Sequence, residues 1–170
     1  NTNKKHINLL REITPREYVS LLSAGIEGLK IKTKNKRIYP NNTLASHILG
    51  TTDIDGKGIA GVEKKFDSQL QSGSNVTLSI HAGIQHITRK LLYDQIKKFE
   101  AEGGAGIIMN AKNGELFSVV SLPDYNANNY NSIFSENLFN KATKGIYELG
   151  STLKLITAAI AFESNLINEN

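Results

Sequence analysis

The most constraining feature of this sequence is an apolar stretch near its C-terminal end. Residues 150–164 predict a helix with apolar side chains on every face: Leu153, Leu155, Ile156, Ala158, Ala159, Ile160, Ala161 and Phe162. A helix that is apolar all round is normally buried on most of its sides. The stretch is too short to cross a bilayer, which takes about 20 apolar residues. We therefore expect this helix to lie inside a protein core.

The composition excludes several classes of function. The chain has 170 residues, a formal net charge of +4 and no cysteine. Its length suits one domain, or one domain and part of another. Disulfides, thiolate zinc sites and a cysteine nucleophile are excluded. The modest positive charge permits an acidic partner, but no aromatic platform accompanies the lysines, which disfavours nucleic-acid binding.

Local patterns in the first half predict short elements. The Thr-Pro-Arg-Glu sequence at residues 14–17 is a capping box, which predicts a helix that ends near Gly25. Apolar and lysine side chains alternate over residues 28–39, so we predict a strand with one solvated, basic face. Thr43 is predicted to cap a short helix ending at Gly50, and residues 62–70 have the spacing of an amphipathic helix.

The second half predicts a longer helix and a hairpin. Small polar residues at 71–75 mark the best domain boundary, and a short strand is predicted over residues 76–80. Residues 82–102 have the longest helical pattern, which Gly103 and Gly104 end. Two apolar runs flank Asn113-Gly114, a strong signal for a β-hairpin, and an Asn-rich loop follows at residues 123–131.

Several possible binding motifs are weak. His6, His47, His81 and His86 lack the spacing of a helical zinc site, so we interpret them as surface or locally bonded side chains. Asp53 and Asp55 precede Gly56 but lack the further ligands of a calcium loop. The glycines at 103–106 precede a predicted strand, which is the wrong context for a phosphate-binding turn.

Ser151 and Lys154 are the candidate catalytic residues. They lie three positions apart at the start of the apolar helix, and therefore on one face of its first turn. Desolvation penalises an ammonium group, so a neutral amine at Lys154 could take the proton of Ser151 and make it nucleophilic. The spacing alone leaves two interpretations of Ser151 open, a nucleophile and a helix cap. The composition gives about one Ser-x-x-Lys by chance, and Ser151 could equally be a helix N-cap.

The surrounding sequence favours the catalytic reading, because it resembles the active-site segment of penicillin-binding transpeptidases. That segment is Glu148-Leu149-Gly150-Ser151-Thr152-Leu153-Lys154, followed by Thr157-Ala158-Ala159 and Phe162-Glu163. Further matches follow in the family's order: Arg37-Ile38-Tyr39-Pro40, Ala45, Leu49-Gly50, Gly58-Ile59-Ala60-Gly61-Val62-Glu63, Phe66-Asp67, Leu78-Ser79-Ile80, Gln85, residues 106–109, Asn113-Gly114-Glu115, Ser121-Leu122-Pro123 and residues 126–128. The chain is most similar to class B penicillin-binding proteins of the septal, cell-division type.

This resemblance implies an α+β fold in two parts. Residues 1–72 would belong to the non-catalytic pedestal (dimerisation-type) domain. Residues 73–170 would form the N-terminal part of the transpeptidase α/β domain, with an incomplete antiparallel sheet plus helices, truncated after the helix that carries the nucleophile.

The resemblance also implies an activity and a location. Ser151 would be the nucleophile and Lys154 the general base of a D,D-transpeptidase that cross-links peptidoglycan stem peptides ending in D-Ala-D-Ala at the septum. β-Lactams would acylate the same serine. No metal or organic cofactor is implied, and no nucleic-acid partner. The expected location is the periplasmic face of a bacterial inner membrane, with glycan-polymerising and other divisome proteins as partners.

The sequence departs from the family pattern at several positions. Leu149 replaces a common proline, His81 an acidic residue and Lys141 an arginine, and the linker at residues 71–75 is short. The family also needs a Ser-x-Asn and a Lys-Thr-Gly element, and we expect this chain to lack both. We therefore expect a piece of a longer protein that is inactive alone. Its membrane anchor would precede Asn1, and the rest of its active site would follow Asn170.

Two alternatives stay open. The chain could be a non-catalytic divisome interaction module in which Ser151 is idle. It could instead be a serine β-lactamase or β-lactam sensor, which shares the Ser-x-x-Lys spacing, although the pedestal-like residues 39–66 argue against this.

Overall fold

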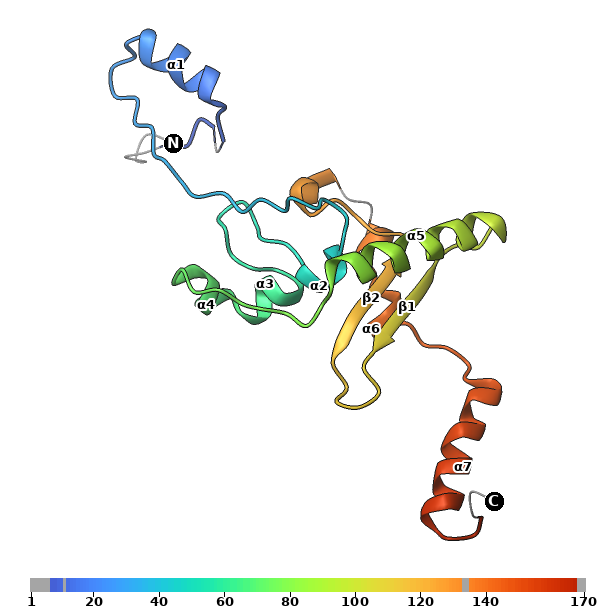
Figure 1. Cartoon of the computed structure of the whole chain (residues 1–170). Helices are drawn as coiled ribbons and strands as arrows, with labels where there is room; N and C mark the ends of the chain where they lie inside the picture. Colours follow the sequence, from blue (N-terminus) through green and yellow to red (C-terminus); the bar gives the residue numbers. More distant parts are fainter. Residues whose placement is uncertain (1–6, 11, 133–134, 168–170) are drawn as a thin grey trace. The chain divides into compact units, whose positions relative to one another are not determined.

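A computed structural model describes residues 7–10, 12–132 and 135–167 of the chain. The chain divides into two compact units, residues 1–35 and 36–170. The regular elements of the described residues are helices, short 3-10 turns and a two-stranded antiparallel sheet (Figure 1), so the predicted α+β class is confirmed.

The first unit contains helix α1 (Pro15–Ser23). The predicted capping box is confirmed: the Glu17 amide donates to Thr14 Oγ1 at 3.3 Å, and the Thr14 amide donates to Glu17 Oε2 at 2.7 Å. The hydrogen bond from the Thr14 amide lowers the pKa of Glu17, because it favours the ionised carboxylate. Ala24 and Gly25 then end the helix through backbone bonds to its last turn, as predicted.

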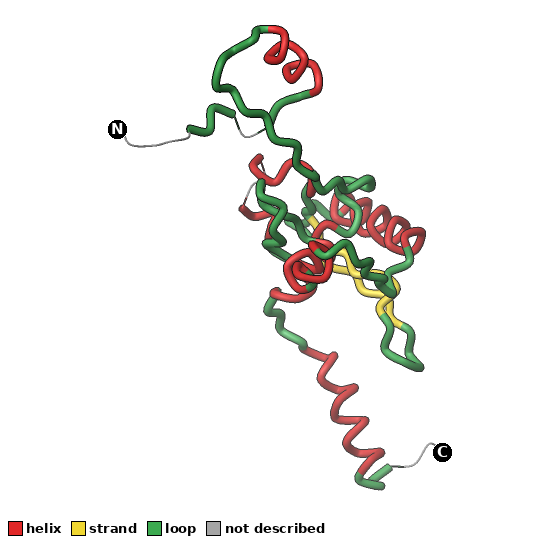
Figure 2. Tube along the Cα trace, turned by 90° about the vertical axis from the view of Figure 1, so that its left-hand side faces the viewer, coloured by secondary structure: helices red, strands yellow, loops and turns green. Residues whose placement is uncertain are grey.

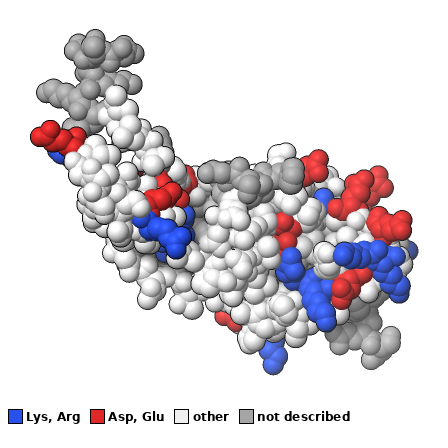
Figure 3. Space-filling view, turned by 90° about the horizontal axis from the view of Figure 1, so that it is seen from above, with Lys and Arg blue, Asp and Glu red and all other residues white. Residues whose placement is uncertain are grey.

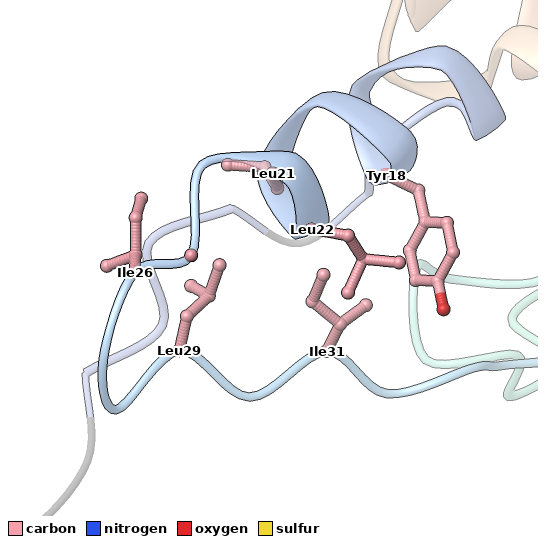
Figure 4. Close-up of a pocket in the computed structure, with 7 residues that line it drawn as sticks. Tyr18, Leu21, Leu22, Ile26, Leu29 and Ile31 are labelled. Atoms are coloured by element: carbon pink, nitrogen blue, oxygen red, sulfur yellow. The ribbon is translucent and has the colours of Figure 1, made fainter.

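The strand predicted over residues 28–39 is wrong. This segment is extended, but among the described residues it forms no ladder with another strand. Leu29 and Ile31 instead face Tyr18 and Leu22 of α1 (Figure 4), where they line an open apolar cavity of about 230 Å³. The alternation of apolar and lysine side chains thus places the apolar ones on one side of the segment. A strand also needs backbone hydrogen bonds to a neighbouring strand, and the alternation does not supply these.

The second unit is built around the predicted hairpin. Strands β1 (Gly104–Met109) and β2 (Leu116–Leu122) pair antiparallel across the Asn113-Gly114 turn, with a register shift between Ile108 and Met109. Helix α5 (Ala82–Lys98) lies along this sheet in both views (Figures 1 and 2). Glycines on β1 allow the close approach, since a Cβ at Gly104 would lie 3.2 Å from Leu92 Cδ1.

Gln85 anchors α5 to the outer edge of β2. Its side chain is only 2% exposed. The amide donates to Val119 O at 2.8 Å, and its oxygen accepts from Val119 N and from Ser118 Oγ, both at 2.9 Å. The Gln85 side chain therefore bonds the edge of β2 as a third strand would, and satisfies polar groups that would otherwise be buried without partners.

Replacing Gln85 with leucine is expected to lower the free energy of unfolding by about 3 kcal/mol, because buried polar groups of Ser118 and Val119 lose their partner. Guanidinium denaturation of the chain measures this loss. Gln95→Leu on the exposed side of the same helix is the matched control, with an expected change within about 0.5 kcal/mol. Equal losses in the two variants would contradict the anchoring role.

Three short helices precede α5: α2 (Ser46–Leu49), α3 (Gly61–Lys65) and α4 (Asp67–Gln71). The predicted N-cap at Thr43 is wrong, because turns occupy residues 40–45 and α2 starts after Ala45, whose φ is 61°. The single helix predicted over residues 62–70 is also wrong. Phe66, at φ −111° and ψ 22°, breaks it, and the Asp67 carboxylate instead accepts from the Gly58 amide at 2.8 Å.

Two further boundaries differ from the predictions. The strand predicted over residues 76–80 is wrong: Ser79 Oγ donates to Leu116 O at 2.8 Å and the His81 amide to Phe117 O at 2.9 Å, without a ladder. The predicted helix over residues 82–102 is confirmed as α5, but it ends at Lys98, since Phe99 leaves helical geometry and Glu100 has a φ of 52°.

After β2 the chain is mostly irregular. Its elements are η1 (Ala127–Ser132), η2 (Ser135–Leu138), α6 (Lys141–Lys144), η3 (Gly150–Thr152) and α7 (Leu153–Glu163). Tyr125 and Ala127 pack with Tyr39 in a small buried cluster, which brings residues nearly 90 positions apart together.

Candidate active site

Ser151 and Lys154 lie where the 3-10 turn η3 continues into α7. Thr152 and Leu153 both have helical backbone angles, with φ and ψ near −63° and −28° and near −62° and −22°, respectively. The two elements therefore form one continuous helical segment. The spacing of three residues places the Ser151 and Lys154 side chains on the same face of it.

Both side chains are exposed, and among the described residues neither has a hydrogen bond or ion pair. The prediction that α7 is buried on most sides is wrong for this chain. Leu155, Ile156 and Ile160 are 71%, 54% and 58% exposed, because only η3 makes substantial contact with α7 within the described part of the chain. The apolar side chains of α7 are therefore bare in the described part of the chain.

Ser151 and Lys154 are the predicted nucleophile and general base, and the structure places them on one helical face. Ser151 carries a hydroxyl and Lys154 an amine, the two groups that a serine nucleophile and its base require. A Ser-x-Asn sequence does occur upstream, at residues 135–137. However, the Asn137 side chain donates to Asp124 O at 3.1 Å, so it has a structural role in η2.

A second polar cluster, which the sequence analysis missed, lies elsewhere in this unit. His47 Nε2 lies 2.8 Å from Asn137 O, and its ring meets the edge of Tyr125 at a centroid distance of 5.1 Å. No sequence pattern indicates that His47 contacts Asn137, which lies 90 positions later in the chain. His81 caps α5 through the Ile84 amide, His86 is exposed and His6 lies outside the described residues.

The charge distribution is mixed. In Figure 3, positively and negatively charged side chains lie side by side on one face. Among the described residues on that face, no large patch of a single charge sign forms.

No group of three or more His, Asp or Glu side chains gathers as a metal site within the described residues. In the same part of the chain, no helix is both long and apolar enough to span a bilayer.

Two family models match the sequence. Residues 1–82 match the penicillin-binding protein dimerisation domain, and residues 104–170 match the penicillin-binding protein transpeptidase domain. The second match includes the hairpin, Ser151 and Lys154.

Curated relatives match over nearly the whole chain. The peptidoglycan D,D-transpeptidase FtsI of Buchnera aphidicola (subsp. Schizaphis graminum) is 31% identical over 196 residues, covering 99% of this chain and 34% of the relative. The protein of the same name in Escherichia coli K12 is 26% identical, covering 100% and 33%. The chain thus spans about a third of the length of these relatives.

Solved structures agree. The D,D-transpeptidase domain of a peptidoglycan glycosyltransferase from Eggerthella lenta superposes with a TM-score of 0.66 and 28% identity, covering 79% of this chain and 33% of that one. A peptidoglycan synthetase from Bifidobacterium adolescentis has a TM-score of 0.68 at 21% identity, covering 92% and 34%, which supports the fold alone. From the two family models and these similarities, the chain belongs to the penicillin-binding proteins, with their dimerisation domain and part of their transpeptidase domain.

Proposed function

We propose that this chain is part of a serine-type D,D-transpeptidase that cross-links peptidoglycan stem peptides during septal cell-wall synthesis. The observation that carries the proposal is the common helical face of Ser151 and Lys154, inside the segment that matches the transpeptidase family model. The names of the FtsI relatives support the reaction.

The proposed reaction has two acyl transfers. The Ser151 oxygen attacks the carbonyl between the two terminal D-Ala residues while Lys154 takes the hydroxyl proton, and the terminal D-Ala leaves with a proton. The resulting ester is then attacked by an amine of a second stem peptide, which releases Ser151. A β-lactam would likewise acylate Ser151: its lactam C–N bond breaks, and the ring nitrogen takes up a proton and stays within the acyl group.

The oxyanion of each step needs at least two donors. The Ser151 amide is one candidate, and a strand carrying the Lys-Thr-Gly element is expected to supply the second. Each such donor stabilises the transition state by roughly 3–4 kcal/mol. Since neither that element nor a second Ser-x-Asn follows Ser151 in these 170 residues, we propose that the chain is inactive alone.

The proposal also assigns a role to each part of the chain. Residues 1–72 would form the pedestal, which contacts glycan-polymerising and other divisome proteins, and residues 73–170 would belong to the catalytic domain. The protein would act in the cell envelope, on the periplasmic side of the inner membrane. The cell-envelope assignment is supported by relatives named as peptidoglycan enzymes.

A fluorescent penicillin tests this function. We expect stoichiometric labelling of a C-terminally extended version that carries the Ser-x-Asn and Lys-Thr-Gly elements, and peptide mapping should place the label on Ser151. The 170-residue chain is expected to take little or no label. A folded extended protein that stays unlabelled would overturn the transpeptidase assignment. Efficient labelling of the short chain would overturn the need for the additional elements.

A non-catalytic interaction module is the second candidate. It is favoured by the exposure of Ser151 and Lys154 and by the bare apolar face of α7. Capture of division proteins by the 170-residue chain, together with an unlabelled extended protein, would support this alternative.

A further inference from the structure

A polar seam joins two segments of the chain that match different domains of the family. We use this name for the contacts between residues 39–51, in the dimerisation-domain match, and residues 124–138, in the transpeptidase-domain match. The Tyr39 amide donates to Asn128 Oδ1, and Asn128 Nδ2 donates to Tyr39 O, both at 2.9 Å. Thr51 Oγ1 donates to Ala127 O at 3.1 Å.

His47 lies half-buried in this seam. The Asn137 oxygen 2.8 Å from its Nε2 is a carbonyl and can only accept, so Nε2 carries a proton and the titration of the ring concerns Nδ1. The ring packs edge-on against Tyr125, whose hydroxyl donates to Ser46 O at 3.0 Å. Among the described residues no acceptor bonds Nδ1, so a second ring proton would have no protein partner there.

The surroundings of His47 are poorly suited to a cation. The charged groups nearby are Asp124, after β2, and Arg89, on α5, which pair with each other at 2.9 Å between Nη2 and Oδ1. The cavity beside His47 has a volume of about 10 Å³, too small for more than about one water molecule. A second proton on His47 would therefore add charge to a half-buried ring whose neighbouring carboxylate, Asp124, is already paired with Arg89.

We propose that His47 is a proton-sensitive latch: as a neutral ring it holds the seam closed, and its protonation releases residues 39–51 from residues 124–138. Such a latch would connect the acidity outside the cytoplasm to the attachment between the dimerisation and transpeptidase segments. It does not depend on the chemistry of Ser151, so it can fail or hold independently of the proposed enzyme function.

The direction of the effect follows from the burial of His47. Burial lowers its pKa from the ordinary 6.5, while the bond to Asn137 and the charge of Asp124 oppose this shift. The open form, with an ordinary histidine, thus binds more protons than the closed form. As pH falls below about 6.5, opening is favoured by up to about tenfold per pH unit until the pKa of the closed form is reached. Above that range the seam stays closed.

Hydrogen exchange on the 170-residue chain tests the latch. The reporters are the amides of Tyr39, bonded to Asn128, and Ala127, bonded to Asn42 O at 3.4 Å. Their protection factors are expected to fall by up to about tenfold per pH unit below 6.5, while those of the β1–β2 amides stay constant. Unchanged protection of the seam between pH 7.5 and pH 5 would overturn the proposal.

Two matched variants identify the group that titrates. In His47→Gln the amide can still donate to Asn137 O but takes no proton in this range, so the pH effect should disappear. His86→Gln, on the exposed side of α5, should keep it. A His47→Gln chain that opens with pH like the wild type would overturn the proposal. If that variant does not fold, NMR titration of the wild type decides: a His47 midpoint at or above that of His86 would exclude the latch.

Discussion

Ser151→Ala in the C-terminally extended protein is expected to reduce acylation by a fluorescent penicillin by at least about a thousandfold. The reason is chemical, because alanine removes the attacking oxygen and the chain contains no cysteine to replace it. The acylation rate under excess label is the measurement, with circular dichroism to establish that the variant keeps its secondary structure.

Thr152→Ala is the control for this experiment. Thr152 is the neighbouring hydroxyl in the same 3-10 turn, and it is exposed like Ser151, so its loss should leave the acylation rate within a few fold. Persistence of the label in Ser151→Ala, or its loss only in Thr152→Ala, would identify a different nucleophile and remove the assignment of Ser151.

Gly50→Ala is expected to destabilise the second unit by more than about 4 kcal/mol. Gly50 ends α2 with a φ of 76° and a ψ of −149°, a conformation essentially reserved for glycine. A Cβ at this position would also lie 1.9 Å from Ala60 O and 2.7 Å from Gly61 N. Since both are backbone atoms, the conflict is relieved only by separating α2 from the start of α3.

Gly56→Ala separates the two causes. Gly56 also has a positive φ, of 80°, but a Cβ there would meet nothing within 4 Å. The expected cost is therefore only the backbone term of about 1–2 kcal/mol. Chemical denaturation of the two variants measures both costs. Equal losses would mean that the contact with Ala60 contributes nothing, contrary to the geometry.

The elements that the sequence predicts correctly are those determined by neighbouring residues. Thr14 and Glu17 make a local capping box, and Asn113-Gly114 forms a local turn between the two apolar runs. The strands expected at residues 28–39 and 76–80 do not form ladders, because a strand depends on a partner that local alternation does not specify. The break at Phe66 likewise depends on the bond between Asp67 and Gly58.

The Ser151–Lys154 pair and the cluster around His47 also differ in whether neighbouring residues determine them. Ser151 and Lys154 are adjacent in sequence, and the family resemblance of their segment marks them as a pair. The partners of His47 come from a distant part of the chain, at Tyr125 and Asn137. A single histidine in an ordinary short helix gives no sign of such contacts, so His47 was indistinguishable from the exposed His86 by sequence.

The seam between residues 39–51 and 124–138 has a consequence for biosynthesis. The two bonds between Tyr39 and Asn128 close a loop of 89 residues. At a ribosomal rate of about 5–20 residues per second, Tyr39 emerges roughly 5–20 s before its partner. During that interval its backbone amide lacks its native acceptor, and the Tyr39 side chain lacks the part of its buried cluster that Tyr125 and Ala127 provide. The nascent chain is therefore most vulnerable to proteases and chaperone capture before Asn128 leaves the exit tunnel.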